Sequence, residues 1–183
     1  MNLKLCTVCS FSVFLLLSCI SEKDLLQKDH VVMRDMSAAN INGNYSNRGD
    51  STDASTYFYN YIIDYNSRML RKQRDSTVTD SRSVINLEYD DAGLLTIRVF
   101  QKDSLIRETT VQVKKQGDVL LFKRHYFLVP IPFLFFFQDE RRMALVSDAN
   151  GNLRAYTGTS NMGWILMAAG QTYFDKQTYK RLK

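Results

Sequence analysis

Few residues of this chain belong to the types that crosslink proteins or bind metals. Its 183 residues include three cysteines, two prolines and two histidines. All three cysteines lie within the first 19 residues, so no disulfide can crosslink the remainder, and an apolar core must hold it together. His30 and His125 stand far apart in the sequence, and no spacing of carboxylates completes a zinc site around either of them. We therefore expect neither a metal nor a cofactor.

Sequence signatures of catalysis are missing as well. The chain has no Gly-x-Ser-x-Gly nucleophile turn, no His-Glu-x-x-His zinc motif and no glycine-rich phosphate loop. The paired carboxylates Asp90-Asp91 and Asp139-Glu140 fall at expected turns or strand edges, where solvated acids are commoner than a glycosidase pair. We therefore expect a protein that is not an enzyme. Its net charge of +5 forms no basic stripe with interleaved aromatic residues, which argues against a nucleic-acid partner.

The N-terminal apolar stretch is too short to cross a membrane as a helix. Residues 5–17 carry no charge, follow Lys4, and would extend only ~20 Å as a helix. Because a hydrocarbon core of ~30 Å needs ~20 residues, this stretch has the length typical of a signal peptide.

The stretch ends in Leu16-Leu17-Ser18-Cys19. An apolar residue three positions before the cysteine and a small residue directly before it make this segment resemble the lipobox of bacterial lipoproteins. The resemblance implies cleavage between Ser18 and Cys19, and a diacylglyceryl group on the Cys19 thiol. Several acyl chains on one residue make membrane attachment effectively permanent. Ile20 stands where some envelopes read an aspartate as an inner-membrane retention signal, so the resemblance favours the outer membrane and leaves the face of that membrane open.

Three parts of the chain follow from this reading: a signal peptide (1–18), a lipidated tether (19–40) and a folded domain (41–183). Within the domain, apolar and polar residues alternate, as they do around Ile85 and Leu87, and Gly-bearing turns separate the alternating runs.

One aromatic segment has two periodicities. Residues 57–65 carry tyrosine at nearly every second position, but Phe58, Tyr61, Ile62 and Tyr65 also fit a helical face. Because aromatic residues favour strands, we expect a strand here.

The short runs and turns predict an all-β domain, an antiparallel meander of about 8–10 strands. Its apolar face must be buried, either by closure into a barrel or by folding over as a β-sandwich. The opening Gly43-Asn44-Tyr45, together with the meander and the lipid anchor, resembles small lipocalin-like lipoproteins of bacterial envelopes, although lipocalins usually have tryptophan where Tyr45 stands. This resemblance implies a barrel.

Residues 127–137 have no polar side chain and contain both prolines, Pro130 and Pro132. Because proline lacks an N–H donor, the segment cannot be a regular central strand throughout. Three interpretations stay open: a loop that plugs the barrel end, a wall or lid of a ligand cavity, and a wedge that contacts a membrane or a partner. The candidate contact residues are Phe127, Phe133, Phe135, Phe136, Phe137 and Trp164.

These features predict a lipid-anchored protein of the cell envelope. The first expected role is non-enzymatic binding of a small apolar or amphipathic ligand. The alternative is a structural or interaction role, in which residues 127–137 dock to an envelope protein or to the membrane.

Overall fold

The computed structural model describes residues 41–50, 57–67, 82–131, 135–165 and 167–182. The expected signal peptide 1–18, the tether 19–40 and Phe133 lie outside these ranges. Within the described part, no helix is both long and apolar enough to span a bilayer.

The described domain is almost entirely antiparallel β-structure, which confirms the predicted fold class. Ten strands form one sheet, and a single helix, α3 (Phe58–Ser67), accompanies them in the described part. The strands are β1 (Gly43–Ser46), β2 (Val84–Tyr89), β3 (Leu94–Gln101), β4 (Ser104–Gln116), β5 (Val119–Phe122), β6 (His125–Ile131), β7 (Phe135–Ser147), β8 (Leu153–Ile165), β9 (Met167–Tyr179) and β10 (Arg181–Leu182).

The sheet is bent but not closed. Its strand order is β10-β1-β2-β3-β4-β5-β7-β8-β9, and β6 pairs with β7 beyond the end of β5. The strands at the two ends of this order, β9 and β10, are separated in the chain only by Lys180. The backbone of Ser46 donates to the Lys180 carbonyl (2.8 Å) and that of Asp50 donates to the Thr178 carbonyl (3.0 Å). These bonds bring the two ends of the sheet to one corner.

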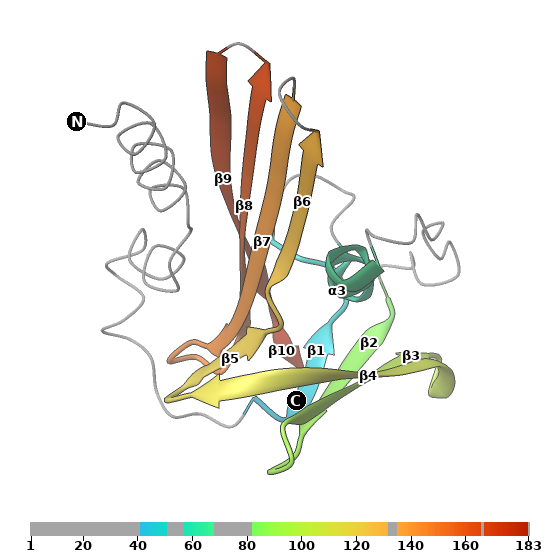
Figure 1. Cartoon of the computed structure of the whole chain (residues 1–183). Coiled ribbons are helices and arrows are strands. Elements are labelled where there is room, and N and C mark those ends of the chain that lie inside the picture. The colour runs from blue at the N-terminus through green and yellow to red at the C-terminus, as the bar shows by residue number, and fades with distance from the viewer. Residues whose placement is uncertain (1–40, 51–56, 68–81, 132–134, 166, 183) are drawn as a thin grey trace, which may run out of the picture.

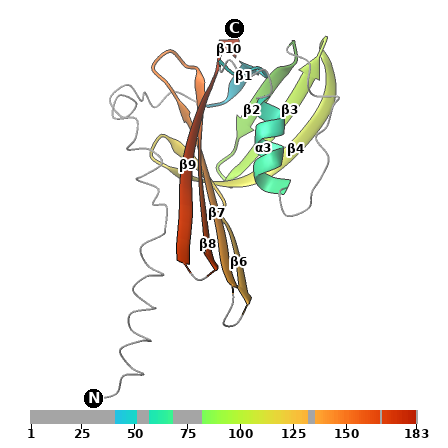
Figure 2. The same ribbon diagram turned by 90° about the horizontal axis from the view of Figure 1, so that it is seen from above.

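The strands divide into a base and a ribbon. The base consists of β1 to β5 and β10, and the ribbon consists of the long strands β6 to β9, which extend away from the base side by side (Figure 1). The view turned by 90° shows the same arrangement, with β1 to β4 on one side and the ribbon on the other (Figure 2). Thirteen residues in each of β7, β8 and β9 give a ribbon ~43 Å long.

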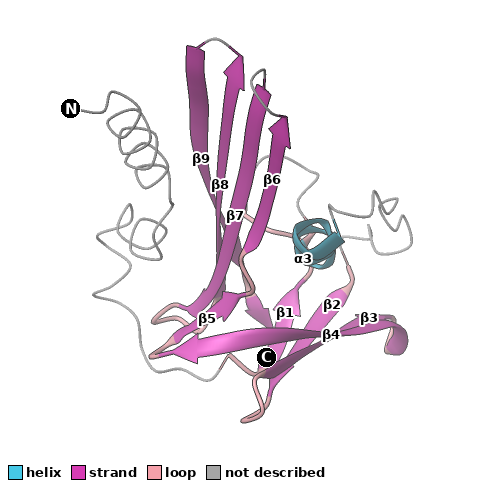
Figure 3. Ribbon diagram, viewed as in Figure 1, coloured by secondary structure: helices cyan, strands magenta, loops and turns pink. Residues whose placement is uncertain are grey.

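Helix α3 lies in the angle between base and ribbon (Figure 3). Its Phe58 and Ile62 are completely buried against strand residues of the core. The strand predicted for 57–65 is therefore wrong. This segment forms a helix rather than a strand because its apolar helical face packs against one continuous apolar surface. That surface is formed by Tyr45, Ile85, Leu87, Leu95, Ile97, Val99, Val113, Leu120, Phe122, Met143, Leu145, Leu153, Ala155 and Tyr179.

The turns have the conformations that their glycines predict. Gly93 (φ +84°) and Gly151 (φ +78°) occupy the left-handed region that glycine tolerates best. In the turn between β7 and β8, the Asp148 carboxylate accepts hydrogen bonds from the backbone of Asn150 and Asn152, both at 2.9 Å. This segment is a hairpin turn, as the sequence indicates.

Asn47 fixes the start of α3. Its carbonyl accepts a hydrogen bond from the Phe58 backbone (2.8 Å), and its side-chain oxygen accepts one from the Tyr59 backbone (3.2 Å). Its own N–H donates to the Ser83 carbonyl (3.1 Å), and the residue is fully buried. Asn47 therefore caps the helix from a distant part of the chain and ties it to the base.

We predict that Asn47→Ala lowers the free energy of unfolding by ~1 kcal/mol, because the Tyr59 N–H loses its side-chain acceptor. For a domain of this size, that corresponds to a fall in Tm of ~2–4 °C in a thermal melt followed by circular dichroism. Asn44→Ala is the matched control, because Asn44 is exposed on β1 and its side chain accepts a hydrogen bond from the Asn86 side chain (2.9 Å) without capping a helix. Equal losses for the two variants would contradict the capping role.

Candidate functional site

The free end of the ribbon is formed by two hairpins lying side by side. One joins β6 to β7 and the other joins β8 to β9, and β7 pairs with β8 between them. Two successive rows across all four strands contain only apolar residues and glycine: Pro130, Phe136, Trp164 and Ala168 in one row, and Val129, Phe137, Gly163 and Ala169 in the next. We call residues 127–137 and 162–170 the ribbon end.

Below these rows the ribbon becomes polar within two residues. Leu128 pairs with Gln138, and in the following row Phe127 pairs with Asp139, which pairs with Asn161. The apolar part from Leu128 to Ile131 is therefore four residues long, or ~13 Å at the rise of a strand.

Exposed apolar and aromatic side chains mark this boundary. Tyr126, Phe127 and Leu128 are 48 %, 46 % and 40 % exposed, and Tyr173 on β9 is 56 % exposed. Because consecutive residues of a strand point to opposite faces, Phe127 and Leu128 present apolar surface on both faces of β6. A groove on one face alone could not cover them both.

The candidate contact residues predicted from the sequence converge on this end. Phe135, Phe136 and Phe137 open β7, and Trp164 lies on β8 directly opposite Phe136. Phe137 is half-buried, Phe127 is exposed, and Phe133 lies outside the described residues. Pro130 takes part in β6, whose described pairing is with β7 only, as expected of an edge strand, and Pro132 lies outside the described residues.

The second apolar hairpin is a feature that sequence reasoning missed. Gly170 predicts a turn, because glycine favours turns, but β8 and β9 pass it without one and remain paired as far as Ile165 and Met167. The available signal was the stretch 162–170, whose only polar side-chain group is the Trp164 indole N–H. Its alanines and glycines indicated a turn rather than the paired end of two long strands.

A charged cluster lies where the ribbon joins the base. Glu140 is completely buried, although we expected a solvated acid, and this interpretation is corrected because its strand β7 is paired on both sides. Its carboxylate forms ion pairs with the Arg142 Nε and the Arg124 Nη2, both at 2.9 Å. Asp139 pairs separately with Arg141 at 3.1 Å. Each buried or half-buried acid of the cluster thus has a cationic partner.

His125 stands beside this cluster and packs against α3. Its ring packs edge-on against Tyr65, with ring centroids 4.9 Å apart. Burial, followed by the positive charges of Arg141 and Lys123, holds the pKa of His125 below its usual value. The Tyr65 hydroxyl donates to the carbonyls of Lys123 (3.0 Å) and Arg141 (3.2 Å), which connects α3 to the junction of β5 and β6.

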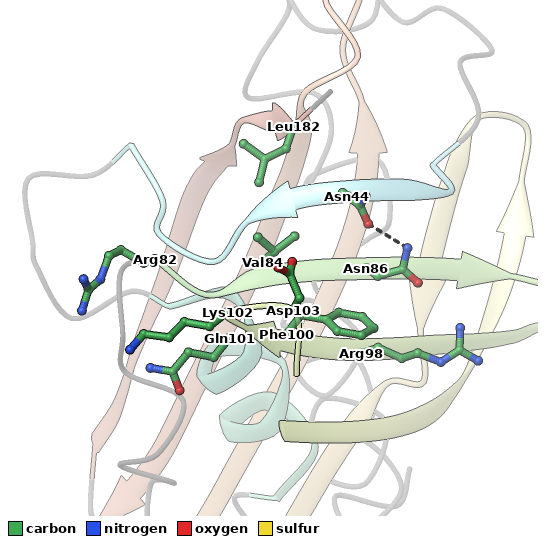
Figure 4. A pocket seen from close by; sticks show the side chains of 10 residues that line it. All are labelled: Asn44, Arg82, Val84, Asn86, Arg98, Phe100, Gln101, Lys102, Asp103 and Leu182. Atoms are coloured by element: carbon green, nitrogen blue, oxygen red, sulfur yellow. Dashed lines mark hydrogen bonds between the residues drawn. The ribbon is translucent and has the colours of Figure 1, made fainter. Parts of the chain in front are cut away.

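A separate pocket of about 740 Å³ lies at β1, β2 and the turn between β3 and β4 (Figure 4). Asn86 donates to Asn44 at 2.9 Å, and Arg98 is held by Glu88 (2.6 Å) and Glu108 (2.8 Å). None of the described residues that line it is a histidine, cysteine, serine or threonine. Since Arg98 is already paired with two carboxylates and the lining has no hydroxyl, thiol or imidazole, we assign no chemistry to this pocket.

No known family model matches the chain, and the comparisons with curated proteins and with solved structures also gave no match. A functional assignment must therefore rest on the geometry of the ribbon end and of the charged cluster.

We predict that Glu140→Gln lowers the free energy of unfolding by ~2–3 kcal/mol, because it leaves Arg142 and Arg124 without their buried counter-charge. Chemical denaturation of the variant measures this loss. Glu108→Gln is the control: it also removes a carboxylate paired with an arginine, but at an exposed site where such a pair contributes less than ~1 kcal/mol. If the two variants were equally stable, Glu140 would not be a structural anchor of the junction.

Proposed function

We propose that this chain is a lipid-anchored protein of the bacterial envelope whose domain docks, without enzymatic activity, onto a membrane through its ribbon end. The anchor is Cys19, in the segment that resembles a lipobox. The observation that carries the docking role is the meeting of two wholly apolar hairpins at one end of the molecule.

Docking fits the arrangement better than a ligand held inside the sheet. Helix α3 occupies the concave face, where its Phe58 and Ile62 are completely buried. Phe127 and Leu128, at the start of the ribbon end, remain 46 % and 40 % exposed, and the ribbon end extends beyond the base (Figure 1). Neighbouring exposed apolar side chains are typical of a contact site.

The depth of the apolar end matches one leaflet of a bilayer. Half of a ~30 Å hydrocarbon core is ~15 Å, and the apolar part of the ribbon measures ~13 Å. A strand that crosses the whole core needs ~9–11 residues, whereas Gln138 already ends the apolar run on β7. The ribbon end is therefore suited to enter one leaflet and not to span the membrane.

The residues at its boundary suit the membrane–water interface. Tyr126 is exposed two residues below Leu128, close to the depth where aromatic belts lie in membrane proteins, whereas the exposed Tyr173 lies one row further down, opposite Thr159. Lipid can also solvate both faces of β6 at once, as the exposure of Phe127 and Leu128 requires, whereas a protein groove covers one face. This favours a membrane over a protein partner.

Proline reduces the cost of placing an edge strand in lipid. Unpaired backbone N–H groups are expensive in hydrocarbon. Pro130 lies on the edge strand β6 and has no N–H to leave unpaired. It thus stands where a lipid-facing edge would most need a proline.

The single tryptophan of the chain, Trp164, lies within the ribbon end and reports its surroundings directly. For the lipid-anchored chain in phosphatidylcholine vesicles, we predict a blue-shifted Trp164 emission that is quenched by lipids brominated on the acyl chain. The anchor alone cannot produce this signal, because it contains no tryptophan. Emission typical of water, unaffected by the brominated lipids, would rule out insertion.

We further predict that the double variant Phe127→Gln/Leu128→Gln weakens this insertion. Burying two half-exposed apolar side chains contributes ~2 kcal/mol, so the ratio of inserted to non-inserted protein should fall ~30-fold. The control is Leu94→Gln/Leu105→Gln, which changes two side chains of similar exposure, 39 % and 51 %, in the base. Quenching that fell equally in both variants would point to a general loss of structure and against docking by the ribbon end.

A further inference from the structure

A second pocket, of about 460 Å³, opens where β5 ends and the chain turns into β6. It lies between the end of β4, the 123–124 connection and the middle of β7. It is therefore at the root of the ribbon, on the same strand connection that leads to the ribbon end.

The rim of this pocket is cationic. Four of its nine lining residues are Lys114, Lys123, Arg124 and Arg142, and no acidic residue is among the described residues that line it. Both lysines are exposed and neither forms an ion pair with a described residue. The rim thus concentrates positive charge at one opening.

Glu140 positions the two arginines of the rim. It lies behind them, fully buried, and holds the Arg142 Nε and the Arg124 Nη2 with separate carboxylate oxygens. One negative charge against four positive ones leaves an excess of three. Guanidinium groups held in place by a carboxylate are well suited to bind phosphate oxygens.

The rest of the lining is mostly apolar. It includes Val113, Leu121, Phe122 and Met143, each at most 8 % exposed. Cationic groups beside apolar side chains match an amphiphile whose anionic group is attached to hydrocarbon. A fully hydrated inorganic anion would gain nothing from the apolar part of such a lining.

The pocket lies just outside the head-group region and reaches it through long cationic side chains. Arg124 is the lining residue nearest the ribbon end, and it precedes Leu128 by four residues, or ~13 Å along the strand. The head-group region adds ~5–8 Å beyond the hydrocarbon on each side of a bilayer, and long cationic side chains extend toward it. The Arg124 guanidinium already lies 5.3 Å from the Tyr126 ring, on the side of the ribbon end.

We propose that this pocket binds the phosphate group of an anionic lipid head group in the membrane that receives the ribbon end. The inference rests on the proposed docking function and adds the class of lipid. Lys114, Lys123, Arg124 and Arg142 supply the contacts, while Glu140 acts as a positioning residue.

The test compares the lipid-anchored chain in vesicles of phosphatidylcholine alone and in vesicles containing phosphatidylglycerol, with Trp164 quenching by brominated lipid as the readout. We expect phosphatidylglycerol to increase the inserted fraction. Lys114→Gln/Lys123→Gln should reduce the inserted-to-free ratio in phosphatidylglycerol vesicles ~30-fold, and change it less than about twofold in phosphatidylcholine. The control Lys115→Gln/Lys180→Gln removes two exposed lysines outside the pocket and should retain the increase.

Each outcome decides the matter. Equal loss in the two lysine variants would show diffuse attraction to a charged surface and would overturn the pocket. Insertion into phosphatidylcholine without any increase from phosphatidylglycerol would overturn the pocket and leave docking standing. Absence of quenching in both lipids would overturn the docking function and, with it, the lipid site.

Discussion

The packing of α3 into the angle between base and ribbon is the interaction on which the rest of the structure depends. Its apolar face covers the concave side of the sheet. A closed barrel without such a helix would have to fill its interior with strand side chains alone. Asn47 holds its first turn to the base, and the Tyr65 hydroxyl holds its end to the junction of β5 and β6. The base therefore has a packed core. Among the described residues, β6 to β9 are joined to it at the ends that lie next to β5 and α3.

Base and ribbon differ in how their apolar side chains are covered. The base buries its apolar residues against one another, whereas Phe127 and Leu128 at the ribbon end remain 46 % and 40 % exposed, and Tyr126 beside them 48 %. A membrane anchor at Cys19 would place the domain beside a lipid bilayer, whose hydrocarbon could cover those exposed side chains. Because the apolar end is shallow, only a few unpaired backbone groups on the β9 edge would leave water. On the β6 edge, Pro130 lowers the number of unpaired N–H groups further.

Local patterns predicted the strands but not the way in which distant segments meet. The alternation at Ile85 and Leu87 predicted strand β2 correctly, because one face of that strand is buried. The segment 57–65 satisfied both periodicities, and only the concave apolar surface built by distant strands selected the helix. Residues 127–137 were recognised as unusual from composition alone. Their neighbour 162–170 was not, because its place beside Phe136 depends on the register of β7 and β8, which a single sequence does not reveal.

The central claim, that the ribbon end lies within one leaflet, is tested most directly by neutron reflectometry of the lipid-anchored chain on a supported phosphatidylcholine bilayer. The account predicts protein scattering within the hydrocarbon of the nearer leaflet to a depth of ~13 Å, and none in the farther leaflet. A protein layer that begins only outside the head groups, with an unperturbed hydrocarbon region beneath it, would contradict the account.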